Sequence, residues 1–248
     1  MLGVLFATAL LHIAPIQDLP KPANAAELDS LLAAEDYTNL VKALSNAQDG
    51  DALFLNMNWE RDTTLRGATV FVTFLYIRDL KRMAASMPAD EGAPMRDTAG
   101  MMSLIAYATI SIDKAYCADA TAAGHRLNQL MEIAGTSFAE LKAMPLETRR
   151  MLLDFIPRAE QMTAKSRLRD GYDSFICRGG MMEMMTGLRA GAPKEVPTPP
   201  GGIGRTFTID PGTGYKPPRA DPEKAASQIA EARAKLPSVL ANMLGLDD

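Results

Sequence analysis

The sequence is poor in the residues from which most enzyme and metal sites are built. Its 248 residues include two histidines, two cysteines and one tryptophan, and aromatic residues make up 6%. His12 falls in an N-terminal segment that we expect to be removed, and His125 alone cannot supply a two-histidine zinc site or a bis-histidine haem. There is also no Cys-x-x-Cys-His or Gly-x-Ser-x-Gly motif, so covalent haem attachment and the common serine-hydrolase motif are excluded.

An excess of charge of one sign is also missing. The chain has 26 Lys and Arg against 30 Asp and Glu, which gives a net charge of -4 and leaves no dominant basic surface for nucleic acid. Hydrophobic residues at 47% and charged residues at 23% are ordinary for a globular protein, and they exclude wholesale disorder or a multi-span membrane protein. We expect no cofactor and no nucleic-acid partner.

The longest apolar run is at the N-terminus and is too short for a membrane span. It covers Met1–Ile16, whereas a spanning helix needs about 20 apolar residues. The small-x-small sequence Ala23-Asn24-Ala25 follows, which together with the apolar run outlines a signal peptide over residues 1–25, although no Lys or Arg precedes it. We expect cleavage after Ala25, a periplasmic or secreted protein, and no transmembrane segment after cleavage. The alternative is a buried apolar first helix.

The two cysteines predict one disulfide, because an oxidising compartment pairs thiols. Cys117 and Cys177 would close a loop of about 60 residues. The spacing of apolar residues suggests that each lies in a long helix, one reaching Cys117 from a cap at Asp97 and one running from about Asp170 to Leu188. The alternative is a pair of buried free thiols in the cytoplasm.

Helical periodicity recurs along the chain and strand-like alternation is almost absent, so the sequence predicts an all-α helical bundle. Side chains suited to N-capping stand at Asp36 and Asp97, and capping boxes at Asn24 with Glu27 and at Ser137 with Glu140. Further helices are expected over about residues 52–85, interrupted near Gly67, and from Pro145 to about Leu168.

The composition divides the expected mature chain into three parts. Residues 26–190 form the helical domain, residues 191–220 a Pro- and Gly-rich tether in which only Thr206–Ile209 alternates like a strand, and residues 221–248 a last helix opened by Asp221 and Pro222. That helix is amphipathic, with Ile229, Leu236, Val239, Leu240, Met243 and Leu244 forming its apolar stripe. The stripe must be buried on the bundle or bound by another chain.

Four residues are candidates for acid–base catalysis, namely Glu60, Asp62, Asp119 and His125. Glu60 and Asp62 flank Arg61 beside the only tryptophan, and Asp119 and His125 follow the first cysteine. Carboxylates with shifted pKa values gather in catalytic clefts. However, Glu60 and Asp62 are two residues apart and cannot share a helical face, so structural ion pairs are the simpler interpretation.

A second candidate is the methionine cluster around Glu183, formed by Met181, Met182, Met184 and Met185. Thioethers are soft ligands, and four of them in an oxidising compartment could bind copper(I). Methionine is also a flexible filler of protein cores, and the chain contains 16, so packing against neighbouring helices explains the cluster equally well.

No convergent catalytic set emerges from these patterns. We therefore expect a non-enzymatic, exported helical protein that binds another protein of the cell envelope as an inhibitor, scaffold or similar module. The contact surface would be a helical groove or the C-terminal helix. The alternatives are a small envelope hydrolase that uses the acidic candidates, and a methionine-rich carrier of a soft metal.

Overall fold

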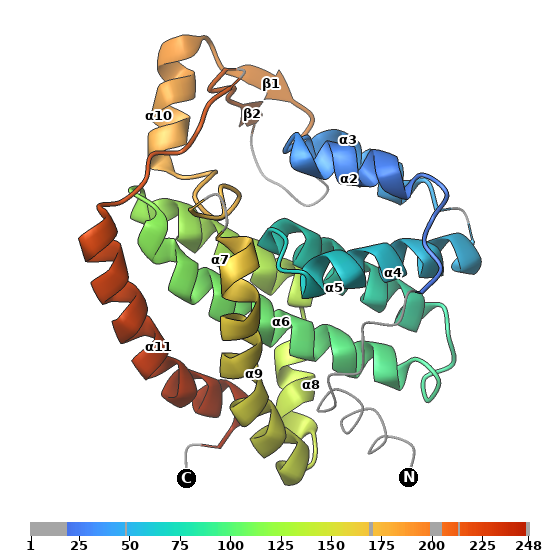
Figure 1. Cartoon of the computed structure of the whole chain (residues 1–248). Coiled ribbons are helices and arrows are strands. Elements are labelled where there is room, and N and C mark those ends of the chain that lie inside the picture. Colours follow the sequence, from blue (N-terminus) through green and yellow to red (C-terminus); the bar gives the residue numbers. More distant parts are fainter. Residues whose placement is uncertain (1–18, 48, 169–170, 199–204, 213, 247–248) are drawn as a thin grey trace.

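The computed structural model describes residues 19–47, 49–168, 171–198, 205–212 and 214–246 (Figure 1). The apolar core of the expected signal peptide lies outside these residues. The chain is all-α, as predicted. In order, its elements are α2 (Ala25–Ala33), α3 (Tyr37–Ser45), α4 (Gly50–Leu65), α5 (Val70–Ala85), α6 (Ala93–Asp113), a 3-10 turn (Lys114–Tyr116), α7 (Ala120–Ala134), α8 (Ser137–Ala143), α9 (Leu146–Arg167), α10 (Met181–Ala190), β1 (Lys194–Val196), β2 (Thr206–Thr208) and α11 (Pro222–Leu244).

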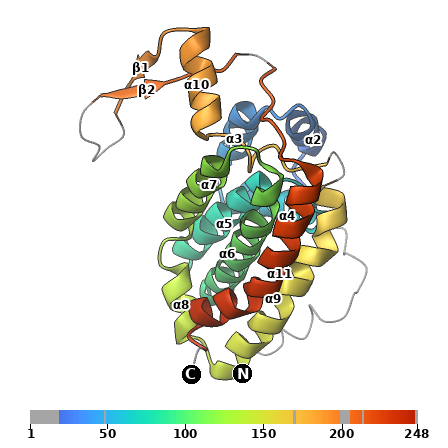
Figure 2. The same ribbon diagram turned by 90° about the vertical axis from the view of Figure 1, so that its left-hand side faces the viewer.

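Helix α6 is the centre of the bundle, and α5, α7, α8, α9 and α11 surround it (Figure 2). It is buried on several sides because apolar residues follow one another around it, including Leu104, Ile110 and Ile112. Gly100 lets α8 approach closely, since a Cβ atom there would lie 3.1 Å from the Leu141 side chain. Helices α2 and α3 form a smaller apolar cluster with α4 and α5.

The predicted break near Gly67 is confirmed, and it separates α4 from α5. Gly67 has a φ of +78°, which favours glycine, and a Cβ atom there would lie 2.7 Å from the carbonyl oxygen of Thr163. The next helix is held at its start from far along the chain. Asp173 accepts hydrogen bonds from the Val70 backbone N–H and the Thr69 hydroxyl, both at 2.7 Å. A buried carboxylate thus caps α5.

The predicted caps at Asp36 and Asp221 are confirmed, because each side chain accepts a backbone N–H from the first turn of its helix. Two expectations are wrong. Asp97 lies inside α6, which begins four residues earlier at Ala93 with Pro94 in its first turn. Asn24 precedes α2 but makes no side-chain hydrogen bond to it.

The second expected capping box, Ser137 with Glu140, is also wrong. Ser137 is the first residue of α8, and Thr136 stands at the N-cap position without a side-chain hydrogen bond to the helix backbone. The Thr136 hydroxyl instead donates to the Glu140 carboxylate at 2.7 Å.

The predicted disulfide between Cys117 and Cys177 is confirmed, with a Cα–Cα distance of 5.1 Å. The prediction that both cysteines lie in long helices is wrong. Helix α6 ends at Asp113, and Cys117 has an extended backbone after the 3-10 turn. On the other side, α10 begins only at Met181, because the preceding segment contains Gly171 and Gly179 at positive φ values of 93° and 79°. The disulfide therefore joins two irregular segments.

A buried ion-pair network joins three helices next to the disulfide. The Arg167 guanidinium of α9 donates to Asp113 of α6 at 2.6 Å. It also donates at 3.0 Å to Glu160, which lies about two turns earlier on α9. Glu160 also accepts from Arg233 of α11 at 3.0 Å. Burial raises the pKa of Asp113, and the adjacent Arg167 opposes this rise. The network fixes α6, α9 and α11 relative to one another.

The last helix returns to its own bundle. Ile229, Leu236, Leu240 and Leu244 of α11 are buried in a cluster with residues of α6, α8 and α9. The end of the tether is also fixed, because the Ala118 N–H donates to the Pro218 carbonyl at 3.1 Å and the Ala220 N–H donates to the Tyr116 carbonyl at 2.9 Å. Earlier in the tether, β1 and β2 pair antiparallel, which confirms the strand-like pattern at residues 206–208.

The chain immediately before α2 contacts α4. The Asn58 side-chain amide donates to the Pro20 carbonyl at 3.0 Å, and the Lys21 ammonium lies 3.1 Å from the Asp62 carboxylate. Cleavage after Ala25 would remove both contacts. Among the described residues, the structure contains no helix with the length and hydrophobicity needed to cross a bilayer.

The disulfide generates the first prediction. We expect Cys117→Ala to lower the free energy of unfolding by about 4 kcal/mol under oxidising conditions, because the bridge closes a loop of 60 residues in the unfolded chain. Urea unfolding of the variant and the wild type, with and without reductant, measures this. Reductant should remove the difference between them, and an equal difference in both conditions would contradict a bridge.

Candidate binding site: the methionine face of helix α10

Asp119, one of the candidate catalytic residues, holds the start of two helices. Its Oδ1 atom accepts from the Thr121 N–H at 2.9 Å and the Thr121 hydroxyl at 2.6 Å, which caps α7. Its Oδ2 atom accepts from the Met182 N–H at 2.7 Å, in the first turn of α10. Burial opposes ionisation of Asp119, but these hydrogen bonds outweigh it and lower the pKa of its carboxyl group. Asp119 therefore positions α10.

The first turn of α10 has two further attachments. The Thr121 hydroxyl accepts from the Met181 N–H at 2.8 Å, and Glu183 accepts from the Gly179 N–H at 2.6 Å while pairing with Arg178 at 3.3 Å. Gly180 is required for this approach, because a Cβ atom there would lie 2.3 Å from Oδ2 of Asp119. Helix α10, which begins four residues after Cys177, is thus fixed to α7.

One face of α10 is covered by its own chain and the other is open. Gly187 is buried against Ile209 and Asp210, which follow β2. On the open face, Met181, Met182 and Met185 are 52%, 45% and 43% exposed, and Leu188 is exposed beside them. With Thr186, Arg189, Tyr215 and Pro218, the three methionines line a shallow groove of about 430 Å³. We call this surface the methionine face.

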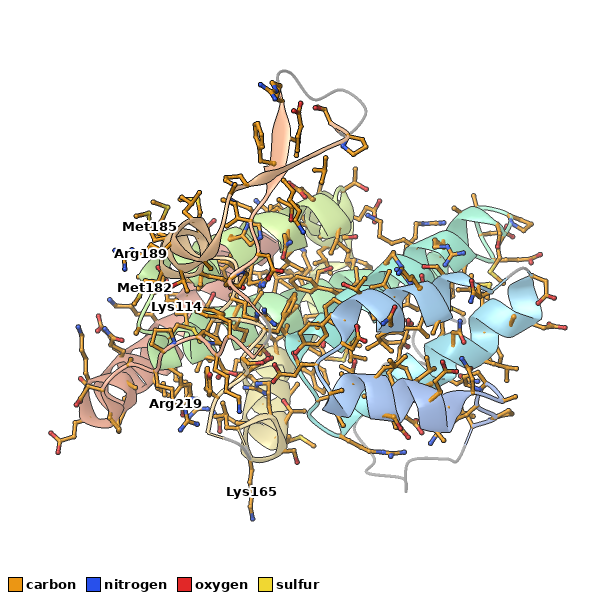
Figure 3. All side chains as sticks on the ribbon, turned by 90° about the horizontal axis from the view of Figure 1, so that it is seen from above. Lys114, Lys165, Met182, Met185, Arg189 and Arg219 are labelled. Carbon is orange, nitrogen blue, oxygen red and sulfur yellow. A yellow bond between two sulfur atoms is a disulfide. The ribbon has the colours of Figure 1, made fainter. Side chains whose placement is uncertain are left out.

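The edge of the methionine face is positively charged. Arg189 lines the groove and is exposed, and it forms no ion pair with a carboxylate of the described residues. Figure 3 shows Met182, Met185 and Arg189 on one side of the molecule. The acidic residue of the helix, Glu183, is engaged by Arg178 and the Gly179 N–H instead. The groove is apolar with a cationic border.

The structure does not bring the four candidate catalytic residues together. Glu60 of α4 is buried, and Asp62 pairs with Lys21, with Arg61 of its own helix and with Arg66 just after the helix. Asp119 caps α7 and α10, and His125 is exposed on α7, where burial of part of the ring and the charge of Arg126 lower the pKa of its imidazole. Each side chain has separate contacts, so the described residues form no catalytic set from these four.

The structure does bring together most of the methionine cluster. Met181, Met182 and Met185 share the groove, whereas Met184 does not line it and is half-buried. No group of three or more His, Cys, Asp or Glu suited to a metal exists among the described residues, and both cysteines are in the disulfide. Sequence reasoning identified the methionines but missed Arg189, Tyr215 and Pro218, because the last two reach the groove only when the tether folds back.

The second prediction concerns Asp119. We expect Asp119→Ala to speed amide hydrogen exchange in the first turn of α10 and to lower the free energy of unfolding by about 1–2 kcal/mol, the usual cost of losing a helix cap. Exchange measured by mass spectrometry on peptides covering residues 178–186 tests this. Asp221→Ala is the matched control, because it removes the cap of α11 and should leave exchange in α10 unchanged.

Comparisons with known proteins return no relatives. No protein-family model, no curated protein and no solved structure matches this chain. The functional proposal therefore rests on the geometry of the methionine face alone.

Proposed function

We propose that this protein is an exported helical protein that binds a partner protein of the cell envelope through the methionine face. The observation that carries the proposal is the exposure of Met181, Met182 and Met185 on a helix whose first turn is fixed by Asp119. Because the backbone of this helix is already fixed, little backbone conformational entropy is lost when a partner covers its large apolar side chains. Methionine also adapts to partners of different shape.

The charge at the edge of the groove specifies the kind of partner. Arg189 favours an acidic ligand, and the apolar floor favours a ligand with one hydrophobic side. A helix with leucines on one face and carboxylates on the other has both properties, and an apolar groove is a common binding site for such a helix. We therefore assign an acidic amphipathic helix of another protein as the occupant.

The other candidate functions are less well supported. Four residues of the α11 stripe, Ile229, Leu236, Leu240 and Leu244, are buried in its own bundle, whereas Val239 is exposed. The C-terminal helix is therefore a poor binding surface. The hydrolase alternative lacks a cluster of the candidate residues. A soft metal carrier would use the same three thioethers, but Arg189 places a positive charge beside any bound cation.

The third prediction tests the partner class with defined probes. We expect a helical peptide with leucine on one face and glutamate on the other to bind the wild type, and a twin with lysine in place of glutamate to bind about tenfold more weakly or not at all. Met182→Ser with Met185→Ser should weaken binding of the acidic peptide about tenfold or more, as loss of central apolar contacts does. Fluorescence anisotropy of labelled peptides measures both effects.

A control and a charge reversal make this test specific. Met162→Ser changes a methionine of α9 that is 69% exposed but outside the groove, and it should have no effect. Arg189→Glu should shift the preference toward the lysine peptide. Absence of binding by either peptide, or equal weakening by the Met162 variant, would overturn the proposal.

Export is supported by the signal-peptide pattern and by the disulfide, which is typical of oxidising compartments. The contacts of Pro20 and Lys21 with α4 bear on where the leader is cut, since cleavage after Ala25 would remove them. A mature protein that starts at residue 26 would also lose the first residue of α2.

The fourth prediction follows from this. We expect the intact mass of protein recovered from the envelope fraction to match residues 26–248, with no thiol alkylated until the protein is reduced. A longer N-terminus that retains Lys21 would support export with an earlier cleavage site and preserve the contact with Asp62. A full-length mass with both thiols alkylated would refute export.

A further inference from the structure

Two carboxyl groups meet in the interior, between the first two long helices. Glu60 of α4 and Asp79 of α5 are both fully buried, and the negative charge of Asp79 acts on the Glu60 carboxyl group. Among the described residues, no group donates a hydrogen bond to either oxygen of Glu60. Two ionised carboxylates repel each other, whereas one proton held between them would supply the missing hydrogen bond, so the pair needs a shared proton to be stable.

The neighbours of the pair decide which group is protonated. Asp79 accepts from Arg78 at 2.7 Å and 3.0 Å, and from Arg82 at 3.1 Å, so its negative charge is balanced. Glu60 has no such donor, and an ionised carboxylate without donors is strongly disfavoured in a protein interior. Glu60 is therefore the acid, and Asp79 accepts its proton in a hydrogen bond.

The charged groups on the surrounding elements leave this assignment intact. On α4, Asp62 forms ion pairs with Lys21, Arg61 and Arg66. On α2, Asp29 accepts from the Trp59 indole at 2.9 Å. On α5, Tyr76 also interacts with Glu60, but burial raises the pKa of Tyr76 to about 12, so it stays neutral at the pH values that matter here. Burial first, and then the negative charge of Asp79, raise the pKa of Glu60 well above its ordinary value, while Arg78 and Arg82 act in the opposite direction.

We propose that Glu60 and Asp79 form a proton-binding site, in which one proton joins α4 to α5 at neutral pH and its loss at higher pH weakens the contact between the two helices. The proposal is independent of the methionine face. Glu60 is one of the four candidates for acid–base catalysis in the sequence. In this proposal it holds a proton that it does not transfer in a reaction.

The direction of the pH effect follows from linkage. The unfolded chain releases the Glu60 proton above about pH 4.5, the ordinary pKa of glutamate, while the folded chain retains it to higher pH. Between these two values the folded state binds one more proton than the unfolded state. The stabilisation that the Glu60 proton provides is therefore complete below the pKa of the unfolded chain and is lost as the pH rises toward the pKa of the folded chain. Within this range the folding equilibrium constant falls about tenfold per pH unit.

The fifth prediction tests the proton directly and through stability. Infrared difference spectra of the wild-type protein at pH 7 should contain the carbonyl band of a buried protonated carboxylic acid, and Glu60→Gln should abolish it. Urea unfolding between pH 5 and pH 8, followed by the fluorescence of Trp59 next to the pair, should show less loss of stability with rising pH in Glu60→Gln than in the wild type. The glutamine is uncharged at every pH and still donates to Asp79.

Two further variants keep the test decisive. Glu132→Gln, on the exposed surface of α7, should retain both the band and the wild-type pH dependence. Asp79→Asn, which leaves Glu60 without a proton acceptor, should shift or remove the band even if it is less stable. The absence of a protonated-acid band in the wild type, or the same pH dependence in wild type and Glu60→Gln, would overturn the proposal.

Discussion

The buried guanidinium of Arg167 is the interaction on which most of the architecture depends. It neutralises Asp113 at the end of α6 and shares Glu160 with Arg233 of α11. Asp113, Glu160 and Arg167 are buried, whereas Arg233 is partly exposed. Removal of Arg167 would leave uncompensated buried charge, which costs about 3–5 kcal/mol. The set therefore fixes where α6 ends. The chain leaves the helix there and brings Cys117 to the disulfide and Asp119 to the two helix starts.

The sequence predicts the helices well where the signal is local. Asp36 and Asp221 cap helices because the capping hydrogen bond spans only two or three residues, and Gly67 breaks a helix through its own backbone preference. The same local rules misplaced Cys117 and Cys177 in helices. The end of α6 depends on an ion pair between Asp113 and Arg167, which are 54 residues apart. The spacing of apolar residues along the sequence contains no information about such a contact.

The candidate site was only partly predictable for the same reason. The pattern of four methionines around Glu183 drew attention to α10, but burial or exposure of their side chains depends on what the rest of the chain covers. Asp119 attracted interest as an acid, and its actual role required the start of α10 to lie beside the start of α7. Glu60 is a related case, since only its position opposite Asp79 explains a buried carboxyl group with no basic partner.

The neighbourhood of Cys117 has a consequence for how the protein is organised. Cys117 is bonded to Cys177 and also pairs with Arg219 as a bridge between extended segments, so the chain leaves and re-enters the bundle at almost the same place. The described residues between Cys177 and Arg219, which include α10, β1 and β2, form an excursion that projects from one end of the molecule (Figure 2). The bundle and the excursion can therefore vary independently in sequence and length, with the anchoring contacts at Cys117 and Asp119 kept constant.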